Sequence, residues 1–122
     1  MKIVLVLVLL VLAGCGTAMS PPEVVNRGDT HVADTLGTPM DAASCLARNA
    51  EWLHDAWAAS VRTFRDRGAE TIVRVTQGFS PAVVVGHFEP APRGSKALLY
   101  FNPIALHFRD KAGLAAQLLK GC

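Results

Sequence analysis

The sequence predicts an α+β domain in two layers, with a long N-terminal helix, an antiparallel meander of three or four strands and a C-terminal helix. Three patterns lead to this fold class. Apolar residues recur at helical spacing over residues 39–67, short β-branched segments separated by Gly and Pro fill residues 70–102, and a second helical pattern follows Asp110. With 122 residues, the chain has room for one domain.

The first helix is expected over residues 39–67. Thr38 suits the N-cap position, Pro39 suits the first helical position, and Gly68 fits a residue that follows a helix. Between them runs one apolar stripe, formed by Leu46, Ala50, Leu53, Trp57, Val61 and Phe64. The alternative is an earlier end to the helix, because the segment from Ala58 to Thr63 can also leave it as extended chain.

The strands are expected at residues 70–77, 82–89 and 96–102. Their connections are short, which favours a meander, because βαβ crossovers need a dozen or more residues. Residues 105–110 are an alternative fourth strand, after which Asp110 caps a helix over residues 111–120. Both faces of the strands carry apolar residues. The face left open by the helices is therefore a candidate interface, and the alternative is that sheet curvature and the helix ends cover most of it.

The first 14 residues have the pattern of a secretory signal. Lys2 precedes an apolar run from Ile3 to Ala13, which is shorter than the roughly 20 residues of a membrane-spanning helix. The next residues, Leu12-Ala13-Gly14-Cys15, resemble the lipobox of bacterial lipoproteins. This resemblance implies that the chain is cleaved before Cys15 and that the Cys15 thiol is acylated, and two or three acyl chains anchor a protein stably to a membrane.

The same resemblance sets the expected organisation and location of the chain. Residues 1–14 are then the signal peptide. Residues 15–37, which are rich in Gly, Pro, Thr and Asp and have no sustained period, are expected to be a flexible lipidated tether before the α+β domain of residues 38–122. The sequence has Gly16 rather than Asp after the cysteine, and by resemblance to the sorting pattern of enteric bacteria this favours the outer membrane, with the domain facing the periplasm.

The two other cysteines are Cys45 and Cys122. Because the resemblance assigns Cys15 to lipid and the chain to an oxidising compartment, we expect one disulfide between them. This disulfide would close a loop over residues 45–122, and for such a loop the chain-entropy model gives about 4–5 kcal/mol of stabilisation. Two free thiols are the alternative. A metal site is less favoured, since neither a Cys-x-x-Cys pair nor a nearby pair of histidines is present.

Motifs for catalysis are missing from the sequence. The four histidines are scattered, no serine lies in a Gly-x-Ser-x-Gly motif, and no Gly-rich phosphate loop occurs. The formal net charge of +2 gives no polyanion-binding surface, so no nucleic-acid partner is expected. We therefore expect a protein that is not an enzyme and that has neither a cofactor nor a metal ion.

Trp52 is the candidate for a partner contact. On a helix, Trp52 projects about 100° away from Leu53 of the apolar stripe. It either packs over the cysteine pair or the C-terminal helix, or it anchors a partner, as Trp often does at binding hot spots. The segment "CLARNAE" and the final "GC" resemble small uncharacterised proteobacterial lipoproteins, which implies no activity.

The function expected from these patterns is non-catalytic binding by a small envelope lipoprotein, with the lipid on Cys15 in the membrane and a protein partner in the periplasm. The alternative is a periplasmic module that binds a small ligand, or inhibits an enzyme, through a cleft between helix and sheet. A hydrolase without a recognisable motif is the third possibility and the least favoured.

Overall fold

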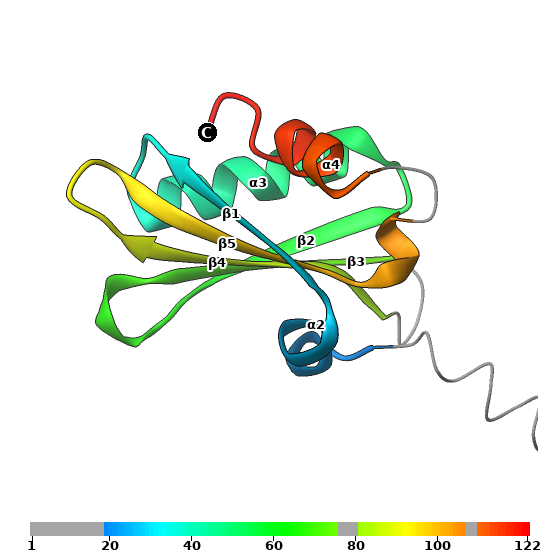
Figure 1. Ribbon diagram of the computed structural model, residues 1–122. Coiled ribbons are helices and arrows are strands. Elements are labelled where there is room, and N and C mark those ends of the chain that lie inside the picture. The colour runs from blue at the N-terminus through cyan, green and yellow to red at the C-terminus, as the bar shows by residue number, and fades with distance from the viewer. Residues whose placement is uncertain (1–18, 76–80, 107–109) are drawn as a thin grey trace, which may run out of the picture.

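A computed structural model describes residues 19–75, 81–106 and 110–122 of the protein. One antiparallel sheet of five strands, in the order β1-β5-β4-β3-β2, forms its centre (Figure 1). The strands are β1 (Asp29–Thr35), β2 (Trp57–Thr63), β3 (Ala69–Val75), β4 (Ala82–Pro90) and β5 (Ser95–Phe101). The helices are α2 (Pro21–Arg27), α3 (Pro39–Leu53) and α4 (Lys111–Leu118), with 3₁₀ turns at Arg65–Arg67 and Pro103–Leu106.

The predicted α+β class and the antiparallel meander are confirmed. The three predicted strands agree with β3, β4 and β5 to within two residues, and the C-terminal helix is α4. The expected count of three or four strands is wrong, because β1 and β2 come from segments assigned to the tether and to the first helix. The alternative fourth strand at residues 105–110 is also wrong where the structure describes it, since Ala105 and Leu106 lie in a 3₁₀ turn.

The long helix over residues 39–67 is corrected to a shorter helix followed by a strand. Thr38 caps α3 as predicted, with its side-chain oxygen accepting a hydrogen bond from the Asp41 amide at 3.2 Å. The helix ends at Leu53, because His54 adopts extended backbone (φ −147°, ψ 120°) and the chain continues into β2. Trp57 and Val61 still pack against the core, but they do so by the side-chain alternation of a strand.

The tether predicted over residues 15–37 is wrong from residue 19 onward. The Val24 side chain of α2 is completely buried, and β1 pairs with β5 along its whole length, from Asp29 opposite Phe101 to Thr35 opposite Ser95. Residues 15–18 and the predicted signal peptide lie outside the described residues. The described part of the domain therefore begins only four residues after Cys15.

The helices lie on both faces of the sheet, which corrects the two-layer prediction (Figure 1). α3 and α4 cover one face, where the larger core contains Leu46, Phe88 and Leu99. α2 covers part of the opposite face, over a smaller cluster that includes Val24 and Val85. Among the helices in the described part of the chain, none has the length and apolar character needed to cross a bilayer.

The C-terminus is fastened to α3. The predicted disulfide between Cys45 and Cys122 is present, with their Cα atoms 5.8 Å apart. One helical turn further along α3, the side-chain amide of Asn49 donates hydrogen bonds to the carbonyl oxygens of Leu118 (2.8 Å) and Lys120 (3.0 Å). Leu118 is the last residue of α4 and Lys120 follows it, at the end where a helix leaves its carbonyl acceptors without partners of its own.

Candidate functional site

A row of paired residues crosses all five strands on the side of the sheet that α2 partly covers. Read from β1 to β2, this cross-strand row is Val32, Leu98, His87, Glu70 and Arg62. The neighbouring row on the same face includes Tyr100, Val85 and Ile72, which lie beneath α2. The cross-strand row lies next to these residues, at the border of the area that α2 covers.

Glu70 of β3 connects its two neighbours in the row. Its side chain is only 4% exposed, and both of its carboxylate oxygens have partners. Arg62 Nε donates a hydrogen bond to Oε1, and His87 Nε2 lies 2.7 Å from Oε2. A buried carboxylate is tolerated where it is paired and hydrogen-bonded, so these contacts also fix the positions of the Arg62 and His87 side chains.

Aromatic side chains surround this polar group. The Phe64 ring meets the His87 ring edge-to-face at 5.1 Å, and the His87 ring meets the Tyr100 ring at 5.2 Å. The Arg62 guanidinium lies 5.3 Å from the centre of the Phe64 ring, within the range of a cation–π contact. Phe64 is partly exposed, so Phe64 and His87 form an aromatic ridge at the surface.

A hollow lies on each side of this ridge. One hollow, of about 250 Å³, separates the ridge from α2 and is walled by Pro21, Pro22 and Val25. The other, of about 300 Å³, extends from the ridge toward Asp66 and Glu89. Phe64 and His87 line both hollows. Side chains of another molecule can enter the two hollows and pack against both sides of the ridge.

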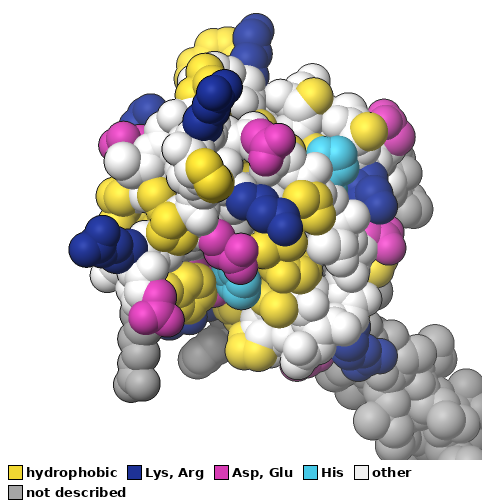
Figure 2. All heavy atoms as spheres, turned by 60° about the vertical axis from the view of Figure 1, so that its left-hand side comes forward, with side chains coloured by type: hydrophobic (Ala, Val, Ile, Leu, Met, Phe, Trp, Pro, Cys, Tyr) yellow, Lys and Arg dark blue, Asp and Glu magenta, His cyan; other side chains and the backbone are white. Residues whose placement is uncertain are grey.

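The rim of the row is charged. One step further along the strands, Asp34 of β1 pairs with Lys96 of β5, and Lys96 pairs with Glu89 of β4. Figure 2 shows the same character on the face it presents, where acidic and basic side chains are interspersed with hydrophobic ones. Within the described ranges, no group of three or more His, Cys, Asp or Glu residues is placed to hold a metal ion.

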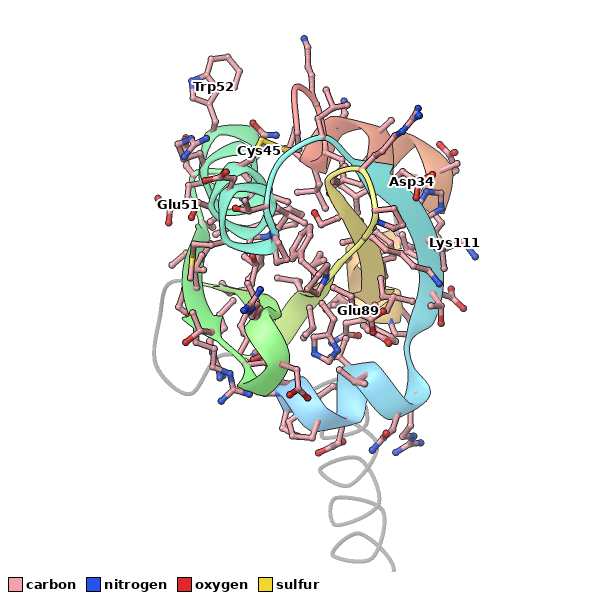
Figure 3. All side chains as sticks on the ribbon, turned by 90° about the vertical axis from the view of Figure 1, so that its left-hand side faces the viewer. Asp34, Cys45, Glu51, Trp52, Glu89 and Lys111 are labelled. Carbon is pink, nitrogen blue, oxygen red and sulfur yellow. A yellow bond between two sulfur atoms is a disulfide. The ribbon has the colours of Figure 1, made fainter. Side chains whose placement is uncertain are left out.

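Trp52 lies apart from the row, on α3 and so on the other side of the sheet. Its side chain is 89% exposed and points away from the body of the molecule (Figure 3). The alternative in which Trp52 packs over the disulfide or the C-terminal helix is therefore wrong. Cys15, the predicted lipidation site, lies outside the described residues.

An apolar pocket of about 410 Å³ lies between helices and sheet at the α3–β2 junction. Its lining includes Leu53, Trp57, Val83, Ile104 and Leu114. The His54 ring, which also lines the pocket, stacks on Trp57 with ring centres 5.1 Å apart. The Ala56 amide donates a hydrogen bond to His54 Nδ1 at 3.1 Å, which assigns the ring proton of the neutral imidazole to Nε2.

The sequence did not indicate the cross-strand row. Arg62 lies in the segment expected to be helical, and His87 is one of four scattered histidines. The row depends on the pairing of all five strands, and two of these strands were not expected. The signal that was present is the alternation around His87, which places apolar residues on both faces of β4.

Comparison of the chain with protein-family models, with curated proteins and with solved structures found no match.

Proposed function

We propose that the protein is a lipoprotein of the bacterial cell envelope, anchored through acylated Cys15, and that its domain binds a protein partner without catalysing a reaction. One observation carries the choice of binding surface. The cross-strand row is exposed at Val32 and Arg62, and its aromatic ridge is flanked by two hollows, one of them beside α2.

The chemistry of this surface supports a protein as the partner. Protein interfaces combine an apolar and aromatic centre with a polar rim, and aromatic and Arg side chains are enriched among their hot spots. Here Val32 and Phe64 are exposed apolar groups near opposite edges of the sheet, Arg62 lies beside Phe64, and charges of both signs form the rim. The Glu70 network holds Arg62 and His87 in place, which reduces the entropy lost when a partner binds.

The anchor and its location rest on the lipobox at residues 12–15 and on Gly16, which favour the outer membrane with the domain on the periplasmic side. Replacement of Cys15 by Ser removes the thiol that carries the lipid. We expect the Cys15→Ser protein to move from the membrane fraction to the soluble periplasmic fraction of the cell, as measured by flotation and immunoblotting. Flotation of Cys15→Ser with membranes, to the same extent as the wild type, would refute the anchor.

Site-specific photo-crosslinking in living cells tests the binding surface. A photoreactive residue at Val32 should give a discrete crosslinked species, which Phe64→Asp should abolish. The same residue at Ala116, exposed on α4 at the opposite face, is the matched control and should give none. Crosslinks from Trp52 but not from Val32 would move the partner contact to α3 and overturn the assignment to the cross-strand row.

A further inference from the structure

The apolar pocket and the start of the described chain share one end of the molecule. The Ala82 amide donates a hydrogen bond to the Met19 carbonyl at 2.9 Å, and the Asn102 side chain donates one to the Ala82 carbonyl at 3.0 Å. Asn102 leads into the 3₁₀ turn Pro103–Leu106, whose Ile104 lines the pocket. Met19, this turn and the pocket therefore meet at the same end of the sheet (Figure 1).

The chain between the lipid and this end is short. Met19 follows Cys15 by four residues, so their Cα atoms are at most about 14 Å apart even when the chain is fully extended. If Cys15 is acylated, as in the proposed function on which this step rests, Met19 lies within that reach of the bilayer surface. The pocket end of the domain is then the end that faces the lipid.

The chemistry of this end suits a lipid surface. Ile104 is 49% exposed, Pro103 beside it is exposed, and the pocket behind them is lined mainly by aliphatic side chains. The stacked rings of Trp57 and His54 combine an apolar body with polar N–H groups, a character that suits the boundary between lipid and water. The acidic groups of this junction are Asp55, exposed in the turn after α3, and Glu51, which accepts a hydrogen bond from the Ala59 amide; both are exposed and can remain in the headgroup water.

We propose that this end of the domain docks on the bilayer that holds Cys15, with Ile104 and the mouth of the apolar pocket against the lipid. The burial of apolar surface in lipid adds to the affinity of the acyl chains. The cross-strand row lies one row further from Met19 than the residues beneath α2, so docking leaves it accessible to a partner.

Fluorescence of the full-length lipoprotein in vesicles tests this orientation. Trp52→Phe leaves Trp57 as the sole tryptophan, at the pocket. In vesicles of phosphatidylcholine and phosphatidylglycerol with brominated acyl chains, the Trp57 emission should fall at least twofold relative to vesicles without bromine. A reporter at the opposite end, Arg93→Trp combined with Trp52→Phe and Trp57→Phe, should keep its emission.

A pair of substitutions tests the apolar contact itself. Ile104→Glu places a charge against the lipid and should remove more than half of the Trp57 quenching. Met40→Glu is the matched control, since Met40 has a similar exposure (39%) in the first turn of α3 at the other end of the molecule, and it should leave the quenching unchanged. Thermal unfolding followed by circular dichroism identifies variants that still fold.

The possible failures are distinguishable. Protein that does not float with the vesicles overturns the lipid anchor, and the docking with it. Protein that floats, but in which Trp57 is quenched no more than the Arg93→Trp reporter, overturns the docking alone. A Trp57 emission that responds to a soluble fatty acid and not to brominated vesicles also overturns the docking, and assigns the pocket to a soluble ligand instead.

Discussion

Glu70 shows how one side chain organises a surface. Its side chain is buried on the sheet face that α2 partly covers, and its two carboxylate oxygens hold the Arg62 and His87 side chains, which reach the surface. A lone buried charge is strongly unfavourable, so the geometry of Arg62 and His87 follows from the need to compensate Glu70. Two of the residues proposed to contact a partner are thus positioned by a buried residue beneath the surface.

The contact between Arg62 and Glu70 gives a prediction. Arg62→Ala leaves one oxygen of a buried carboxylate without its charged donor, and we expect it to lower the free energy of unfolding by about 1–3 kcal/mol. Urea denaturation measures this change. Arg74→Ala, at an exposed arginine of the adjacent strand, is the control and should change stability by about 0.5 kcal/mol or less.

A double substitution tests whether the effect comes from this contact. Glu70→Gln removes the charge that Arg62 compensates, so Arg62→Ala should be less destabilising in the Glu70→Gln protein than in the wild type. Additive effects of the two substitutions would contradict a coupled pair.

At the scale of elements, the predicted and observed structures agree where one periodicity dominates. The β-branched segments of β3 and β4, the cap at Thr38 and the start of α4 were all predictable. The segment after Leu53 was not, because the spacing of Leu53, Trp57 and Val61 fits a helical stripe, while Trp57, Ala59 and Val61 also fit the alternation of a strand. Pairing with β3 decides in favour of the strand.

β1 was missed for a different reason. It is an edge strand in which Thr35 is the only fully buried residue, so its sequence has almost no hydrophobic pattern. Its stability comes from backbone pairing with β5, which depends on the rest of the sheet rather than on its own residues. The cross-strand row was unpredictable for the same reason, since it needs the register of β1 and β2.

The N-cap of α4 was predicted from the sequence, and its energetic effect can be measured. Asp110 accepts a hydrogen bond from the Gly113 amide at 2.9 Å. Asp110→Ala should destabilise the protein by about 1 kcal/mol, whereas Asp110→Asn, which keeps an acceptor oxygen, should retain most of the stability. Thermal unfolding of the two variants gives the comparison. Equal losses for Ala and Asn would show that the hydrogen bond to the Gly113 amide is not the source of the stabilisation.

At the scale of the molecule, the C-terminus is held to early elements of the chain. The Leu36 amide, directly after β1, donates a hydrogen bond to the Cys122 carbonyl at 2.9 Å, and Cys122 is bonded to Cys45 of α3. The disulfide joins residues 77 apart in sequence, so it restricts most of the described chain when the protein unfolds.

Loss of this disulfide should therefore be costly. We expect the double variant Cys45→Ser, Cys122→Ser to lose about 2–5 kcal/mol of stability, and the oxidised wild type to lose a similar amount on reduction. Denaturation with and without a reductant provides both values. A reductant should not change the stability of the double variant. This measurement is the control for any action of the reductant on Cys15.

The position of α2 and β1 leads to the last prediction. A protein that begins at Thr38 lacks both elements, so the backbone groups of β5 that pair with β1 become an open edge, and the apolar cluster around Val85 loses the cover of Val24. We expect residues 38–122 to show no cooperative thermal transition, whereas residues 19–122 should unfold cooperatively. The two proteins have the same disulfide, so the difference reports on residues 19–37, which contain α2 and β1. Cooperative unfolding of residues 38–122 with the stability of the longer protein would return residues 19–37 to the role of a tether, and would also remove the short link on which the proposed docking at the membrane depends.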